Sequence, residues 1–203
     1  MSFFARAKHQ FLPVPENRRI ETAPFLDACG EVVPFFDLLG STAFAPVKMD
    51  INGNITKLRK IYETDPARFK TLQDVVEKEI ENKTTKAKNS GTDALLWLRR
   101  ALHFIIAFLK EVLVGNSELA PCATKAYEKT LKKYHGFLVR GVFSLAMKAV
   151  PYRKDFMKAL GGAEEEQYTV MEDIQNFVDV LDSNLDVLTE FYAENNCDDE
   201  RKV

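Results

Sequence analysis

The most apolar segment of the chain lies near its middle. In "ALLWLRRALHFIIAFLKEVL", residues 94–113, apolar side chains cover most of the circumference of a helix. Only Arg99, His103 and Lys110 form a narrow polar strip. A helix that is apolar nearly all round is buried between neighbours. The pattern therefore predicts a central buried helix over about residues 90–114, ended by Gly115.

Other segments with helical periodicity surround this one along the chain. The alternation typical of strands is absent, and no long Ser/Gly-rich linker or internal repeat divides the sequence. We therefore predict one all-α domain over residues 1–203, with flexible termini and helices stacked in layers. The further predicted helices span 21–39, 46–62, 64–83, 121–149, 152–160 and 168–194, the third opened by Asp65-Pro66 and the helix at 152–160 ended by Gly161-Gly162.

Three polar residues stand at the edge of the apolar stripe of the helix over 46–62. At about 100° per residue, Asp50, Asn54 and Lys57 project within an arc of roughly 60°. They offer two carboxylate oxygens, an amide that donates and accepts, and a fixed positive donor. That inventory suits a ligand rich in hydroxyl groups, such as a sugar. An ordinary surface pair between Asp50 and Lys57 is the alternative interpretation.

An indole and an imidazole add to these candidates. Trp97 is the only tryptophan, and it lies near the start of the central helix. Its flat ring either packs in the core or serves as a platform for a sugar ring. His135 is predicted to share a helix face with Leu131, Leu138 and Val142, where it is either a core residue or a ligand contact.

Composition narrows the function classes. The chain has 28 basic and 30 acidic residues, so the basic excess typical of nucleic-acid binding is absent. Three cysteines, widely spaced, indicate neither a zinc cluster nor a disulfide framework, and they fit a reducing compartment. No secretory signal, membrane span or catalytic motif is recognisable. We expect a cytosolic protein that is no enzyme, with no metal, no cofactor and no nucleic-acid partner.

Five segments together resemble one known family. They are "FFDLLG", "FAPVKMDINGNITKLRKIY", "ALLWLRRAL", "ATKAYEKTLKKYHGFLVRGVF" and "AVPYRKDFMKAL", and they resemble the glycolipid transfer protein family, in order, over about residues 20–195. The resemblance implies a two-layer all-α helix sandwich that opens to admit lipid chains. Some segments are similar also to the glycolipid-transfer domain of a Golgi adaptor protein. Because Met1 stands just ahead of the matching region, we expect a stand-alone protein.

The resemblance also implies a headgroup site. The residues that match the family pattern are Asp50, Asn54, Lys57, Trp97 and His135. In this interpretation Trp97 stacks on the first sugar ring, while Asp50 accepts from sugar hydroxyls and from the ceramide amide. His135 donates to the ceramide carbonyl, and the remaining two residues bind sugar hydroxyls.

The same resemblance assigns residues to a lipid-chain pocket and to a membrane contact. Phe137 stands where soluble glycolipid carriers have Trp, and it is predicted to point outward and contact membranes together with Lys132 and Lys133. Asp93 and Arg201 depart from the family pattern beside the site. The residues that match the lipid-chain pocket are Phe35, Phe36, Phe44, Val47, Phe104, Phe108, Leu131, Phe143, Phe156 and Leu160.

The implied function is the transfer of glycosphingolipids between membranes without nucleotide. One alternative is a ceramide-1-phosphate carrier, although that branch has Arg where this chain has Trp97. A second is a glycolipid sensor that acts through a protein partner. A third, a glycosidase, requires two carboxylates at one bond, and the pattern supplies only Asp50. Phe35-Phe36-Asp37 resembles a motif read by endoplasmic-reticulum adaptor proteins, and a monomer is expected.

Overall fold

The computed structural model describes residues 1–115, 117–161 and 167–203, and within these ranges it contains helices and no strand. One isolated antiparallel bridge joins Glu21 and Thr71. The helices are α1 (Phe3–Arg6), α2 (Thr22–Val32), α3 (Phe35–Gly40), α4 (Ala45–Thr64), α5 (Leu72–Glu81), α6 (Gly91–Val114), α7 (Leu119–Lys129), the 3-10 turn η1 (Lys132–Tyr134), α8 (Phe137–Lys148), α9 (Arg153–Ala159) and α10 (Gln167–Glu194).

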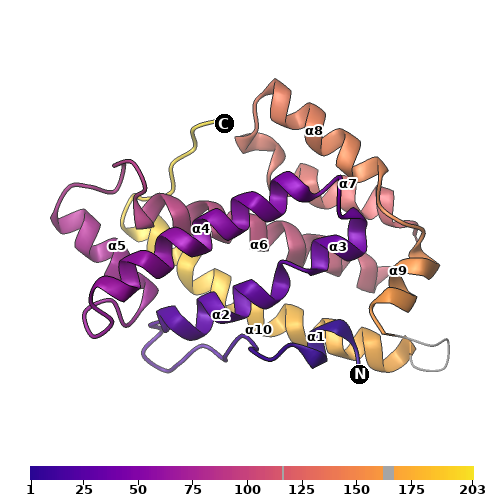
Figure 1. Ribbon diagram of the computed structural model, residues 1–203, viewed down its shortest axis with the longest axis horizontal. Coiled ribbons are helices and arrows are strands. Elements are labelled where there is room, and N and C mark those ends of the chain that lie inside the picture. The colour runs from indigo at the N-terminus through magenta and orange to yellow at the C-terminus, as the bar shows by residue number, and fades with distance from the viewer. Residues whose placement is uncertain (116, 162–166) are drawn as a thin grey trace.

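The helices form two layers around α6. In Figure 1, α2, α3 and α4 cross the front of the molecule, with α6 and α10 behind them. Helix α6 packs against α4, α5, α7 and α10, and most of its side chains are buried. The prediction of an all-α sandwich with a central helix over 90–114 is confirmed.

The start of α6 is fixed by a carboxylate from α5. The Glu79 carboxylate accepts from the amides of Gly91 (2.7 Å) and Thr92 (2.9 Å). A negative charge is favourable there because the first amides of a helix are unpaired and carry partial positive charge. A Cβ on Gly91 would lie 2.6 Å from a Val75 methyl, so only glycine permits this approach. These contacts position the end of α6 that carries the tryptophan.

The predicted helix over 21–39 is wrong as a single element. It is two helices, α2 and α3, separated at Val33 and Pro34. Proline has no amide hydrogen to donate within a helix, and it stands here as the residue preceding α3.

The prediction that Asp65-Pro66 opens the third helix is also wrong. Helix α5 begins only at Leu72, because Thr71 and Asp74 form a reciprocal capping box. The Thr71 amide donates to the Asp74 carboxylate (2.7 Å), and the Asp74 amide donates to the Thr71 hydroxyl (3.2 Å).

The predicted helix over 121–149 is interrupted, so α7 and α8 are separate. At the interruption His135 has an extended backbone. The last residue of the chain pairs with this segment: the Val203 amide donates to the Tyr134 carbonyl (3.0 Å), and the Gly136 amide donates to the Val203 carbonyl (2.6 Å). A Cβ on Gly136 would lie 3.2 Å from the Val203 oxygen. The backbone groups left free at the break are thus paired by a residue that is distant in sequence.

The N-terminal residues contact the rest of the fold, whereas residues 201–203 are exposed, and the flexibility expected of the termini stays a prediction. Ser2 and Phe4 are buried, and the Phe3 amide donates to the Leu160 carbonyl (2.7 Å). Gly161, at the predicted end of the helix over 152–160, follows α9; Gly162 lies outside the described residues.

All ten residues predicted to line the lipid-chain pocket are buried. The rings of Phe35, Phe108 and Phe156 contact one another, with centroids 5.9–6.2 Å apart. Phe36 and Phe44 pack 5.7 Å apart beside them. In this structure the predicted pocket is thus filled by its own side chains. None of the described helices is long and apolar enough to cross a membrane.

Candidate functional site

Helix α4 carries the first half of the predicted headgroup set. The Asn54 amide donates to the Asp50 carboxylate (3.2 Å), one turn away. Asn54 is buried, Lys57 is half-buried and Asp50 is exposed. The three residues therefore lie across the boundary between the core and solvent.

Asp50 is exposed, yet the protein around its carboxyl group disfavours the ionised form. Burial of its carboxyl group raises its pKa, Lys57 lowers it, and the charge of Asp93 on α6 raises it. An ionised carboxylate with few partners is a strong acceptor for hydroxyl and amide donors. This helix thus presents an acceptor that a ligand can satisfy.

Helix α6 carries the second half, Trp97. The indole is half-buried, whereas its neighbours Leu96 and Leu98 are buried. Its ring lies nearly parallel to the His135 ring, at 14° and 6.3 Å between centroids. The Arg100 guanidinium lies 4.9 Å from the indole centroid. Trp97 is therefore a supported aromatic surface that is only partly covered.

His135 is buried and neutral. Burial lowers its pKa to about 4, and the nearby Arg140 and Arg100 contribute in the same direction. Its Nδ1 lies 3.1 Å from the Tyr127 hydroxyl oxygen. If the hydroxyl donates to Nδ1, the imidazole proton resides on Nε2. The ring then has an uncharged N–H to offer to a carbonyl oxygen.

The structure adds a second acid that the sequence analysis placed only as a departure. The charge of Asp93 contributes to the raised pKa of Asp50, so a second acid lies near the one that the pattern supplied. Asp93 forms an ion pair with Arg201, the other departure. The two residues are far apart in sequence, and no periodic or motif signal links them.

Helix α8 presents an exposed apolar surface, which we call the α8 surface. It comprises Phe137, Leu138, Val142 and Leu145, and the Phe137 side chain is 90% exposed. The last three are spaced i, i+4 and i+7, so they share one helix face. The outward position predicted for Phe137 is confirmed.

The prediction that Leu138 and Val142 share a buried face with His135 is wrong, because the helix is interrupted before Phe137. These exposed residues were missed as surface candidates for the same reason. Of the two predicted basic contacts, Lys132 pairs with Glu128 (2.7 Å) and Lys133 lies 4.7 Å from the centroid of the Tyr134 ring.

The motif predicted to bind an endoplasmic-reticulum adaptor is buried. Phe35 and Phe36 have no exposed surface, and Asp37 forms an ion pair with Lys48. A partner would reach the two phenylalanines only if α3 left the core.

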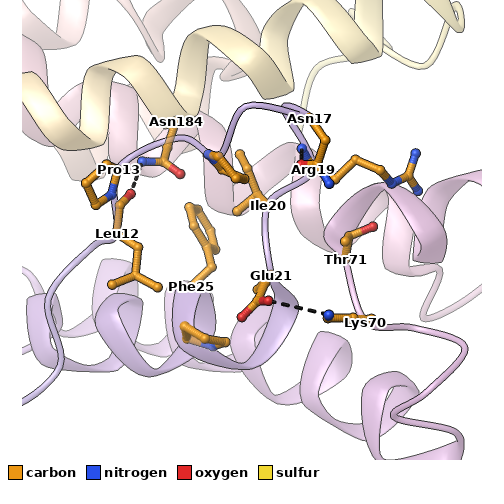
Figure 2. A pocket seen from close by; sticks show the side chains of 12 residues that line it. Leu12, Pro13, Asn17, Arg19, Ile20, Glu21, Phe25, Lys70, Thr71 and Asn184 are labelled. Carbon is orange, nitrogen blue, oxygen red and sulfur yellow. Dashed lines mark hydrogen bonds and ion pairs between the residues drawn. The ribbon is translucent and has the colours of Figure 1, made fainter.

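A separate cavity of about 340 Å³ lies behind the N-terminal segment (Figure 2). Asn184 donates to the Leu12 carbonyl across it (2.9 Å), and Lys70 lies 3.8 Å from the Glu21 carboxylate. It includes none of the predicted headgroup or chain-pocket residues. Among the described residues, no group of three or more His, Cys, Asp or Glu side chains could hold a metal ion.

Comparison with known sequences gives one consistent result. The family model described as "Glycolipid transfer protein (GLTP)" matches residues 20–162. The chain is 40% identical to a glycolipid transfer protein of Danio rerio over 204 residues, covering 97% of this chain and 98% of that protein. It is 39% identical to the human pleckstrin homology domain-containing family A member 8, covering 94% of this chain but only 38% of that longer protein.

Solved structures agree with these matches. A structure that describes how FAPP2 selects simple glycosphingolipids with the GLTP fold superposes with a TM-score of 0.94 at 37% identity, over 100% of both chains. The fungal glycolipid transfer protein HET-C2 superposes with a TM-score of 0.84 at 36% identity, over 95% and 97% of the chains. Mouse ceramide-1-phosphate transfer protein shares the fold, with a TM-score of 0.88 at 21% identity over 98% of this chain and 100% of that one.

Proposed function

Because the chain belongs to the glycolipid transfer protein family, we propose that it binds glycosphingolipids and carries them between membranes. The observation that carries the proposal is the half-buried Trp97, stacked beside neutral His135 and next to the helix that bears the Asp50–Asn54 pair. A sugar needs both an apolar platform for its C–H face and convergent polar groups for its hydroxyls.

Each headgroup residue has a role that fits its environment. Trp97 stacks against the first sugar ring. Asp50 accepts from sugar hydroxyls and from the ceramide amide, Asn54 and Lys57 bind further hydroxyls, and His135 donates from Nε2 to the ceramide carbonyl. A neutral hydrogen bond contributes only about 1 kcal/mol net, so affinity and selectivity depend on several such bonds together.

The hydrocarbon chains enter the phenylalanine cluster around Phe35, Phe108 and Phe156. Because these rings fill the space themselves, chain entry requires them to move apart and α-helical layers to separate slightly. Apolar contacts between rings are then exchanged for apolar contacts with the lipid. Such an exchange keeps hydrocarbon out of water in both states, which allows a carrier to load and unload without nucleotide.

The α8 surface is the proposed membrane contact. An exposed Phe137 inserts its ring among lipid headgroups, and the apolar face behind it follows. We expect the contact to be transient and the protein to reside in the cytosol between encounters. Monomeric protein suffices, since one chain holds the complete set of proposed residues.

The alternatives differ in chemistry. A ceramide-1-phosphate headgroup needs cations where Trp97 stands. A glycosidase could draw on Asp50 and Asp93, but Asp93 is engaged by Arg201. A glycolipid sensor would bind the same ligand and would differ from a carrier only in its role in the cell. Binding of an adaptor through Phe35-Phe36-Asp37 is not expected of the folded chain, since the two rings are buried.

A vesicle assay tests the proposed function. Donor vesicles would contain labelled glucosylceramide, ceramide-1-phosphate or phosphatidylcholine, and the acceptor vesicles none. We expect transfer of glucosylceramide alone, without ATP or metal, and strong loss of transfer in Trp97→Ala. Thermal unfolding controls for damage, because truncating a packed Trp costs about 3–5 kcal/mol. Equal transfer of all three lipids would refute the selectivity, and free sugar in the products would establish hydrolysis.

A further inference from the structure

A further cavity, of about 290 Å³, lies between α6, the end of α7, η1, α10 and the C-terminal residues. Its lining includes Arg99, Arg100, Lys129, Lys133 and Asp198, and it contains none of the predicted headgroup residues. We call it the arginine cavity. None of the roles proposed above uses the cavity itself, although Arg100 also lies 4.9 Å from the centroid of the Trp97 ring.

Two buried guanidinium groups share one carboxylate there. Arg99 and Arg100 are 3% and 4% exposed. Asp198 accepts from Arg99 (3.0 Å) through one oxygen and from Arg100 (2.9 Å) through the other. Arg99 donates further to the Thr189 hydroxyl (2.8 Å).

This carboxylate does not satisfy both arginines. The Nε of Arg99 and the Nε and Nη1 of Arg100 are buried and have no hydrogen-bond acceptor. Buried donors are nearly always paired, and buried charges lacking partners are costly. Three unpaired nitrogens in one place indicate that the site has capacity for more acceptor oxygens than Asp198 supplies.

The surrounding charges are mostly positive. Lys129 and Lys133 line the cavity, and Asp198 is its one acidic lining residue among those the structure describes. Lys129 pairs with Glu111, which lies outside the lining (2.7 Å). His103 contributes no charge near neutral pH, because burial and the charge of Arg99 lower its pKa to about 4.

We propose that the arginine cavity binds a phosphate group, which displaces the Asp198 carboxylate from Arg99 and Arg100. A phosphate offers more oxygens and more charge than a carboxylate, and guanidinium groups bind it through paired N–H donors. Asp198 acts as an internal anion that occupies the site when phosphate is absent.

Displacement of Asp198 changes the end of the chain. Three further contacts hold residues 198–203. Arg100 donates to the Asp199 carbonyl, and Asp93 forms an ion pair with Arg201. Val203 pairs through its backbone with Gly136. Gly136 is adjacent to His135. Phosphate in the arginine cavity therefore loosens a segment that borders the headgroup site.

The binding test uses inorganic phosphate with the full chain, at constant ionic strength, against chloride. We expect phosphate to raise the unfolding temperature and to give a saturable calorimetric signal. Asp198→Asn removes the competing charge and should bind phosphate about tenfold more tightly, as expected for a hydrogen bond to a charged group. Lys129→Gln should bind it more weakly.

A matched control comes from the same helix. Lys125 also pairs with Glu111 at 2.7 Å and has similar exposure, but it does not line the cavity. Lys125→Gln should therefore bind phosphate as the wild type does. Equal weakening in both lysine variants would overturn the assignment to the cavity.

Two further arms identify the source of the phosphate and the displacement. The second probe is vesicles of phosphatidylcholine with phosphatidic acid. If Asp198→Asn binds these vesicles more tightly than the wild type does, but binds inorganic phosphate no more tightly, the ligand is a lipid headgroup. Amide exchange at Gly136 should accelerate in phosphate. If neither probe binds the wild type or Asp198→Asn, the site is refuted. If the Gly136 amide stays equally protected from exchange with phosphate bound, the displacement of residues 198–203 is refuted.

Discussion

The surroundings of the Asp50 carboxylate disfavour its ionised form. Its pKa is raised by burial and by Asp93, and only partly lowered by Lys57. A group whose pKa is raised on folding stabilises the fold at low pH and loses that contribution as pH rises through its folded pKa. At neutral pH the ionised form therefore costs stability, which is typical of residues retained for binding.

Asp50→Asn should separate these two effects. We expect an unchanged or higher unfolding temperature near pH 7, because the poorly solvated charge is gone. Glycolipid transfer should fall about tenfold, because hydrogen bonds to a charged acceptor contribute about 1.5–3 kcal/mol. Paired thermal unfolding and vesicle assays measure both. Loss of stability with normal transfer would show that Asp50 is only a surface partner of Lys57.

His135 gives a prediction about acid. Its pKa falls from 6.5 to about 4 on folding, so the neutral ring stabilises the fold above about pH 6.5, and this contribution is lost as pH falls towards 4. The urea midpoint of the wild type should decline over that window, and His135→Gln should decline less. His103→Gln, whose pKa is also lowered to about 4, should show the same flattening but retain glycolipid transfer. Identical slopes in all three proteins would contradict the buried neutral state.

At the scale of elements, α8 exposes apolar side chains on one face while it buries Phe143, Ala146 and Met147 on the other. Helix α6 buries residues on nearly all sides, whereas α8 exposes Phe137 and the face of Leu138, Val142 and Leu145. Exposed apolar residues gathered on one helix commonly mark an interaction surface. The interruption at His135–Gly136 sets the orientation of α8, so the headgroup contact and the membrane contact meet at one backbone segment.

Phe137→Ala should weaken vesicle binding and slow transfer without altering headgroup selectivity. Phe137→Trp should strengthen vesicle binding, because indole favours the membrane interface. Sedimentation with phosphatidylcholine vesicles measures both. Leu12→Ala is the control, since Leu12 is exposed but lies on the N-terminal segment. A drop in thermal stability with normal vesicle binding would remove Phe137 from the membrane contact.

At the scale of the whole molecule, the layers are held together by a core that must also accept lipid. The phenylalanine rings contact one another rather than surround a rigid tunnel. A core that is close-packed without ligand is stable, yet ring-to-ring contacts are readily exchanged for contacts with hydrocarbon. Ligand bound only by the folded state then adds stability that rises with the logarithm of its concentration above its dissociation constant.

Phe108→Ala should lower the free energy of unfolding by about 3–5 kcal/mol, since a buried ring is replaced by a void. Phe137→Ala, the exposed counterpart, should change it by less than about 0.5 kcal/mol. Urea unfolding of both variants, with and without glucosylceramide, makes the comparison. If lipid restores the free energy of unfolding of Phe108→Ala, the hydrocarbon chain lies in the phenylalanine cluster. If lipid stabilises neither protein, the chain does not bind there.

Local patterns in the sequence determine much of this protein. The apolar circumference of residues 94–113 specifies a buried central helix, because only burial satisfies such a surface. The positions of Asp50, Asn54 and Lys57 follow from the 100° step of one helix, and the family resemblance rests on motifs that stay in order. These features depend on neighbours within a few turns, so they are readable without the fold.

Contacts between distant residues decided the rest. The break at His135–Gly136 is paired with Val203, and the ion pair of Asp93 with Arg201 brings the C-terminal residues to the first turn of α6. Helical periodicity had continued the helix through this break and so placed Leu138 and Val142 inside. Backbone pairing and ion pairs between residues about 70 to 110 positions apart leave no periodic trace in the sequence, and only the tertiary structure brings those groups together.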